Sequence, residues 1–279
     1  MSTERAFRFG RAQHLVGVAG LPDAATPAAP VGVIVLNAGM VHRVGPFRLH
    51  VELTRRLNAD GYPTLRFDLS SLGDSSAADE AGSQAQQVKA DVADAMSLLA
   101  SHAGCSRFVL LGLCSGAQNA HGVALDEPRV AGAVFLDGYA YRTLGFRLRH
   151  YLPRLWSGSR WQRFISRSLQ ARASQGDDVF AVRFPPREQV QRELATMLDR
   201  GLRLHFIYSG GVTRYFNHPR QFRECYGREV ADHPALRMDL LDGTDHTYTL
   251  VCDRERMFGH VERWLKEQFP PPAPRVAAG

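Results

Sequence analysis

The chain has 279 residues, of which 44% are hydrophobic and 22% are charged. These values are ordinary for a globular protein and exclude an intrinsically disordered chain. No apolar run approaches the roughly 18 residues that a membrane-spanning helix needs, and the charged N-terminus does not resemble a signal peptide. We therefore expect a cytoplasmic protein without a membrane span. The formal net charge of +6 raises the question of a polyanionic partner.

Continuous apolar runs alternate with helical stretches along the chain, a pattern typical of a parallel sheet covered on both faces. The N-terminal stretch 6–20 adds one or two antiparallel edge strands. We therefore predict an α/β fold with a doubly wound, mostly parallel sheet of about eight strands. The predicted strands are 31–39, 62–68, 107–113, 130–137, 202–210 and 236–241, and the helices between them are about 47–61, 82–103, 116–126, 217–231 and 253–268.

One interval breaks this alternation, because about 64 residues separate the strand at 130–137 from the next one at 202. A structureless loop of that length is improbable, so we predict a helical lid at 139–200, inserted after strand 6. Its helices are expected at about 144–155, 159–173 and 186–200. The core then comprises 1–138 and 201–269, and the Pro-rich end, 270–279, is expected to be a disordered tail.

The positive charge is concentrated in this insert. Residues 139–176 contain eight arginines and no lysine, aspartate or glutamate, so the remaining chain is slightly acidic. No nucleic-acid-binding motif or aromatic stacking platform accompanies the arginines, and we do not expect a nucleic-acid partner. Arg142, Arg147 and Arg149 are candidates for binding an anion at the lid, although an Arg-rich amphipathic helix can also be purely structural.

The segment RFVLLGLCSGAQNA carries the strongest chemical signal. A buried strand runs into Gly112-Leu113-Cys114-Ser115-Gly116 and then into a helix, the context of a G-x-S-x-G nucleophile elbow with cysteine in the central position. A strained turn needs small flanking residues, which the two glycines supply. The helix N-terminus favours a thiolate at Cys114. Ser115 lies one place past the apex and is the weaker candidate nucleophile, and a buried cysteine can also be a simple core residue.

A general base for this nucleophile is expected after the last predicted strand. His246, in the segment LDGTDHT, follows the strand at 236–241 and would reach the C-terminal edge of the sheet. We predict that it activates Cys114.

The third member of a triad is less obvious. The loop after the penultimate strand, 209–217, contains no carboxylate, and the first acid beyond it is Glu224, within a helix. Asp137, at the end of the strand 130–137, is the best substitute because that strand end also faces the site. Asp245 adjoins His246, but neighbouring side chains diverge, so a loop-capping role is favoured for it. A thiol also depends less on an orienting acid than a hydroxyl does. A dyad of Cys114 and His246 without an acid is therefore an open alternative.

An oxyanion is expected to be held by backbone N–H groups of Ser115 and of Met40, because Gly39 permits close approach of the loop after the first parallel strand. Arg43 in the same loop could bind an anionic group, but we favour its pairing with Asp68 or Asp74. No Cys or His spacing typical of a metal site or a disulfide framework occurs among Cys105, Cys114, Cys225 and Cys252, so no cofactor or metal is expected.

These motifs together resemble the α/β-hydrolase superfamily over about residues 10–270. Three stretches carry the resemblance: 37–75, GLCSGA at 112–117 with LDGYAYRT at 136–143, and GTDHTYT at 243–249. They are similar to exosortase-system-associated hydrolases and to stand-alone acyl hydrolases or thioesterases of polyketide and nonribosomal peptide clusters. The resemblance implies an α/β-hydrolase fold and a cofactor-free hydrolase or acyltransferase, with Cys114 and His246 at matching positions. The sequence departs from the pattern at the usual acid.

The expected reaction is acyl transfer from a thioester or ester through an S-acyl-cysteine intermediate, in secondary-metabolite or lipid-like acyl metabolism. A cysteine favours thioesters, because both sulfurs are comparable leaving groups. The substrate is expected to be a small acyl compound, free or presented on an acyl carrier protein or coenzyme A. The alternative is a non-catalytic α/β-hydrolase-fold protein that binds a ligand or partner.

Overall fold

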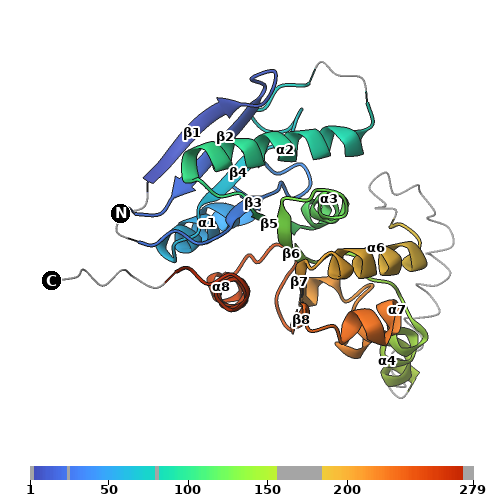
Figure 1. Cartoon of the computed structure of the whole chain (residues 1–279). Coiled ribbons are helices and arrows are strands. Elements are labelled where there is room, and N and C mark those ends of the chain that lie inside the picture. Colours follow the sequence, from blue (N-terminus) through green and yellow to red (C-terminus); the bar gives the residue numbers. More distant parts are fainter. Residues whose placement is uncertain (1–2, 24–25, 79–81, 156–183, 273–279) are drawn as a thin grey trace.

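The chain folds around one eight-stranded sheet, seen in a computed structural model that describes residues 3–23, 26–78, 82–155 and 184–272 (Figure 1). The strand order is β1-β2-β4-β3-β5-β6-β7-β8. The pairs β1–β2 and β2–β4 are antiparallel and all others are parallel, so the predicted mostly parallel sheet is confirmed. The strands are β1 Thr3–Phe9, β2 Leu15–Leu21, β3 Gly32–Val35, β4 Thr64–Asp68, β5 Phe108–Leu113, β6 Val130–Leu136, β7 Arg203–Ser209 and β8 Leu236–Leu241.

Helices cover both faces of the sheet. Apolar residues of α1 and α8 pack on one face, and those of α2, α3, α6 and α7 pack on the other. This two-sided burial is why the strands are continuous apolar runs. The α-helices are α1 Leu49–Ala59, α2 Gln84–Ala103, α3 Ser115–Ala124, α4 Leu144–Leu155, α6 Arg187–Asp199, α7 Arg220–Ala231 and α8 Val251–Gln268.

Strand β3 illustrates how the two faces are filled. Val33 and Val35 belong to the core under α1 and α8, whereas Ile34 belongs to the core on the opposite face. The strand is shorter than the predicted 31–39, because the chain leaves the sheet after Val35 and forms a loop that passes over the start of α3. That loop becomes part of the candidate site.

Aromatic side chains fill the core between β6, β7 and α7. The ring of Phe206 lies 4.7 Å from that of Phe135 and 5.0 Å from that of Phe222. Each of these rings is fully buried or nearly so. Tyr208 and Tyr226 extend the cluster, and both donate hydrogen bonds to the carbonyl of Tyr139, just beyond β6. This cluster supports the chain where it leaves β6.

Two of the three helices predicted within the lid are present as α4 and α6. Helix α6 is anchored on the core by Val190, Leu194, Met197 and Leu198. In α4, Phe146 is buried, whereas Leu148 is 58% exposed. The third predicted lid helix, 159–173, lies outside the described residues, so the lid stays a prediction. Among the helices that the structure describes, none is both long and apolar enough to cross a membrane.

Candidate active site

Cys114 lies on a sharp turn between β5 and α3. Its φ of 58° and ψ of −117° are unusual for a residue other than glycine. The backbone N–H of Cys114 donates to the carbonyl of Leu136, so the turn is tied to the end of β6. The side chain is partly buried, and the thiol is free. This is the strand–turn–helix geometry that we predicted for the segment.

The two glycines of the motif allow helix α3 to start directly beside the sheet. A β-carbon on Gly112 would lie 2.1 Å from the backbone of Gly116, and one on Gly116 would lie 2.5 Å from the carbonyl oxygen of Asn37. Both contacts are far shorter than real β-carbons show. The small flanking residues are therefore required by backbone packing.

The structure brings His246 and Asp137 together. The Nδ1 atom of His246 lies 2.6 Å from Oδ2 of Asp137, and because a carboxylate only accepts, the imidazole Nδ1–H donates. This leaves the Nε2 side of the ring for the hydrogen bond between His246 and the thiol of Cys114. Asp137 is fully buried, whereas His246 is 36% exposed. Cys114, His246 and Asp137 thus form one hydrogen-bonded row.

Two residues that sequence reasoning missed hold Asp137 in place. Ser209, the last residue of β7, donates from its backbone N–H to Oδ1 of Asp137 at 2.6 Å and from its hydroxyl to Oδ2 at 2.7 Å. Tyr215 donates to the Asp137 carbonyl at 3.4 Å. The only sequence signal was the position of Ser209 at the strand end beside the one that carries Asp137.

The electrostatics of the row favour an ion pair. The hydrogen bond from His246 lowers the pKa of the Cys114 thiol, against the effect of burial, and the backbone N–H of Ser115 lowers it further. The Asp137 carboxylate, and then Cys114, raise the pKa of His246 to about 10. By contrast, burial raises the pKa of Cys105 and of Cys225. Cys114 therefore has thiolate character that neither buried cysteine shares.

The loop that carries His246 is fixed by short-range contacts. Asp245 accepts hydrogen bonds from the backbone N–H groups of Thr247 and Thr249, so the predicted loop-capping role of Asp245 is confirmed. The hydroxyl of Thr244 accepts from the N–H of Gly210, which ties this loop to the short helix η3, Gly210–Val212, after β7.

The loop after β3 lies against the start of α3. The backbone N–H of Gly39 donates to the hydroxyl of Ser115 at 2.8 Å. That N–H is thus used to hold the loop and does not face the thiol as an oxyanion donor would. The side chain of Met40 is 81% exposed, and its backbone N–H makes no hydrogen bond to any residue that the structure describes. Met40 and the N–H of Ser115 stay the predicted oxyanion donors.

The same loop is anchored to the carboxyl end of β4. Asp68, fully buried, accepts from the side-chain amide of Asn37 at 3.1 Å and pairs with Arg43 at 2.5 Å. Arg43 also pairs with Asp74 at 2.6 Å. The pairing that we favoured for Arg43 is confirmed, and its charge is neutralised within the fold.

The comparisons with known proteins agree with this geometry. Residues 20–278 match the alpha/beta hydrolase family. The chain belongs to this family. No curated protein sequence matches this α/β hydrolase significantly.

Solved structures similar to this α/β hydrolase include several enzymes. An esterase of Pyrococcus furiosus has a TM-score of 0.61 and 17% identity, over 96% of this chain and 91% of that one. An α/β serine hydrolase without a lid from Xanthomonas campestris has a TM-score of 0.58 and 13% identity, over 97% and 96%. A proline iminopeptidase of Mycobacterium smegmatis has a TM-score of 0.57 and 16% identity, over 95% and 98%. At these identities the likeness concerns the fold.

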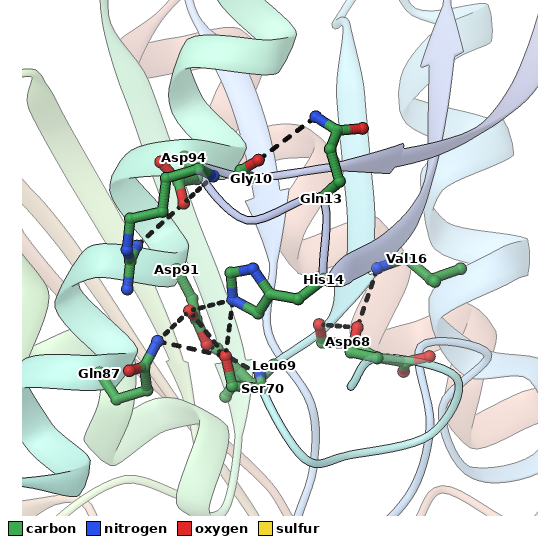
Figure 2. Close-up of polar contacts among 12 residues, drawn as sticks. Gly10, Gln13, His14, Val16, Asp68, Leu69, Ser70, Gln87, Asp91 and Asp94 are labelled. Atoms are coloured by element: carbon green, nitrogen blue, oxygen red, sulfur yellow. Dashed lines mark hydrogen bonds and ion pairs between the residues drawn. The ribbon is translucent and has the colours of Figure 1, made fainter. Parts of the chain in front are cut away.

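A second Ser/His/Asp group occurs on the other side of β4, where it supports the loop after that strand (Figure 2). Ser70 donates to Asp91 at 2.9 Å and lies 3.0 Å from Nε2 of His14, while Asp91 lies 3.5 Å from the same Nε2 atom. In a catalytic triad the acid binds the opposite imidazole nitrogen, and Nδ1 of His14 has no partner among the described residues. We therefore assign this buried group to holding the loop in place.

The three arginines predicted to bind an anion differ in their surroundings. Arg149 pairs with Glu224 at 3.0 Å, so its charge is balanced within this α/β hydrolase and we remove it from the candidate anion site. Arg142 donates from Nε to the carbonyl of Arg214 at 2.8 Å. Arg142 and Arg147 line a common cavity.

One group of side chains has metal-ligand chemistry. Among the residues that the structure describes, His205, Asp239 and His260 place ligand atoms within 4.8 Å of one another. His205 is the third residue of β7, about 13 Å along the strand from Ser209. Arg237 donates to the same carboxylate oxygen of Asp239 that both imidazoles approach. That guanidinium already balances the carboxylate, so the group is described as an ion-pair network.

Proposed function

We propose that this α/β hydrolase is an acyl hydrolase or acyltransferase that acts on a thioester or ester through an S-acyl-Cys114 intermediate. The observation that supports the proposal most strongly is the row Cys114–His246–Asp137, in which the thiol lies on the turn before α3 and its pKa is lowered by His246. A lowered thiol pKa on an accessible turn is the property of a nucleophile rather than of a structural cysteine.

The reaction follows from the groups in the row. The Cys114 thiolate attacks the acyl carbonyl carbon, and the tetrahedral oxyanion accepts hydrogen bonds from the N–H groups of Ser115 and Met40. The intermediate collapses as the bond to the leaving group breaks, and His246 gives its proton to that group. Water or an acceptor alcohol or amine then loses a proton to His246, attacks the S-acyl carbon and releases Cys114. Asp137 keeps the imidazole oriented throughout.

A thioester is the favoured donor. A thiolate leaving group resembles the attacking thiolate in basicity, so the tetrahedral intermediate partitions forward without strong acid catalysis. An alkoxide or amide leaving group is more basic, so it depends more strongly on proton donation by His246. The similar solved structures include esterases, which agrees with acyl chemistry in general. We further propose a role in secondary-metabolite or lipid-like acyl metabolism. The proposed compartment is the cytoplasm, where thiols stay reduced.

Ser115 is the weaker candidate nucleophile. Its hydroxyl accepts the N–H of Gly39, and its position is the first residue of α3 rather than the apex of the turn. Cys114 has the hydrogen bond to His246. These contacts favour cysteine over serine as the attacking residue.

The test is intact-protein mass spectrometry after incubation with a panel of acyl-pantetheine thioesters. Cys252 is an exposed free cysteine, so every variant is made in a Cys252→Ala background to remove non-specific labelling. We expect the mass of one acyl group on the protein, mapped to Cys114, and turnover of the thioester. Cys114→Ala abolishes both, because the thiol that attacks the thioester and carries the acyl group is removed.

Cys114→Ser is the matched variant. Its hydroxyl is a poorer nucleophile, so turnover falls while an O-acyl adduct remains detectable. Full turnover by the Cys114→Ala protein would overturn the proposal. Loss of turnover in the Cys252→Ala background alone would also contradict it, since that residue lies outside the row.

A further inference from the structure

A cavity lined by positive charge lies between the start of α4 and the segment that follows β7. It has a volume of about 370 Å³ and is lined by Arg142, Phe146, Arg147, His150 and Arg214. Three of these five residues carry a guanidinium group, and the lining has no carboxylate. We call this set of residues the arginine pocket.

The charges of the arginine pocket are not balanced by the part of the chain that the structure describes. Within 3–23, 26–78, 82–155 and 184–272, Arg142, Arg147 and Arg214 make no ion pair, and all three are exposed. Arg149, on the same helix as Arg147, pairs with Glu224. Three neighbouring like charges repel one another unless an anion binds between them.

The pocket is also held in a defined shape. The Nε atom of Arg142 donates to the Arg214 carbonyl at 2.8 Å, which fixes this guanidinium and leaves its terminal nitrogens available. The ring of Phe146, which is buried, stacks on the ring of His150 with centroids 5.5 Å apart. A guanidinium fixed in this way loses less side-chain entropy when it binds an anion.

The arginine pocket is linked to the candidate site through two of its residues. Arg214 precedes Tyr215, whose hydroxyl donates to the carbonyl of Asp137 at 3.4 Å. Burial raises the pKa of Tyr215, and the charges of Asp137 and Cys114 raise it further. Arg142 follows Asp137 by five residues and is fixed to Arg214.

We infer that the arginine pocket binds the phosphate of a phosphopantetheine thioester, and so positions its acyl group at Cys114. The inference rests on the proposed function and adds the substrate class. Three guanidinium groups match the charged oxygens of a phosphate better than a single carboxylate, which one arginine satisfies. In coenzyme A this phosphate is part of a diphosphate, and on an acyl carrier protein it is a phosphodiester with one negative charge.

The first test measures binding without chemistry. Isothermal titration calorimetry compares 4′-phosphopantetheine with pantetheine on the Cys114→Ala protein. We expect the phosphate to tighten binding at least about tenfold, the effect of one charge-assisted hydrogen bond. Arg142→Gln/Arg147→Gln removes this difference, whereas Arg228→Gln, an exposed arginine on α7 that changes the same kind of charge, retains it. Equal affinities for the two compounds would overturn the inference.

The second test measures turnover of acyl-4′-phosphopantetheine and of acyl-pantetheine. We expect kcat/KM to be higher for the phosphorylated donor, and the double variant to lose that preference while it still hydrolyses acyl-pantetheine. Equal kcat/KM values in the wild type overturn the inference and leave the proposed function standing. If neither donor acylates Cys114, the proposed function fails, but calorimetry still decides whether the pocket binds phosphate. Acyl-coenzyme A and an acylated carrier protein then distinguish the two sources of the group.

Discussion

Asp137 owes its position to an unusual backbone conformation at the end of β6. Its φ is 52°, and its N–H donates to the carbonyl of Ile207 on the neighbouring strand. The carboxylate is thereby directed along the edge of the sheet toward Ser209 and His246. The strain of this conformation is of order 1 kcal/mol or more and is offset by three hydrogen bonds to the two oxygens.

Replacing Asp137 by asparagine tests its role. The amide keeps the size of the side chain but removes the charge that raises the pKa of His246. The pKa of the Cys114 thiol then moves up toward the ordinary value of about 8.5. In the Cys252→Ala background, the rate of iodoacetamide alkylation at pH 6 should fall about tenfold or more, and kcat/KM should fall about a hundredfold.

The sign of the pH dependence follows from the two shifts. Wild-type Cys114 is a thiolate above its lowered pKa, and His246 stays protonated up to its raised pKa, so alkylation extends to lower pH than that of an ordinary cysteine. In Asp137→Asn the alkylation profile shifts to higher pH. An unchanged alkylation profile together with near-wild-type kcat/KM would indicate a Cys–His dyad in which Asp137 is only structural.

For single residues, the sequence was informative where a residue type is rare for its position. Asp137 was predictable as a carboxylate at a strand end, in a chain whose loop 209–217 has none. Ser209 was not, because a serine at the end of a buried strand is common and its contact with Asp137 depends on the pairing of β6 with β7. In the sequence, Arg147 and Arg149 were equivalent candidates for binding an anion. They differ in the structure because Glu224 of α7 pairs with Arg149.

Among the elements, η3 and the loop that carries His246 approach each other closely. A β-carbon on Gly211 would lie 2.3 Å from the backbone nitrogen of His246. The loop after β7 therefore approaches the base directly, although it supplies no carboxylate. Its role in the site is to set the position of His246.

Gly211→Ala should displace His246 without unfolding the protein. A shift of about 1 Å in a catalytic group costs on the order of a hundredfold in rate, so we expect kcat to fall by about that factor. Gly259→Ala, on α8, is the matched control, because its β-carbon would meet no atom within 4 Å. Circular dichroism checks the fold of both variants. A fully active Gly211→Ala protein would show that the loop carrying His246 can accommodate the added methyl group without loss of function.

Regular elements were predicted well because hydrophobic patterning determines them. Helix α2 was expected at 82–103 and runs from Gln84 to Ala103, preceded by a capping box of Ser83 and Gln86. The predicted strand 31–39 ended too late, because residues beyond Val35 are buried by loop contacts rather than by the sheet. Burial alone does not separate a strand from a loop that crosses it.

The stability of the whole molecule comes from two hydrophobic cores, one on each face of the sheet. Phe206 contributes to the core on the face of α7, where it contacts Phe135 and Phe222. The topology was predictable because parallel strands with helical crossovers follow few paths. The aromatic pairing within the core was not, since it depends on which helix covers which strand.

Phe206→Ala should lower the free energy of unfolding by about 3–5 kcal/mol, the cost of a large cavity in a packed core. Urea denaturation followed by tryptophan fluorescence measures this change. The matched control is Phe47→Ala, because Phe47 is 55% exposed, and it should change stability by less than about 0.5 kcal/mol. Similar losses for the two variants would contradict this account of the core.

The order of the reacting groups along the chain has a consequence for synthesis. Cys114 and Asp137 come from neighbouring strands joined by α3, whereas His246 lies 109 residues beyond Asp137. The hydrogen bond that lowers the pKa of the thiol thus forms only once β8 and the loop after it have left the ribosome and docked. Until then a nascent chain carries an ordinary cysteine, with little tendency to react with cellular electrophiles.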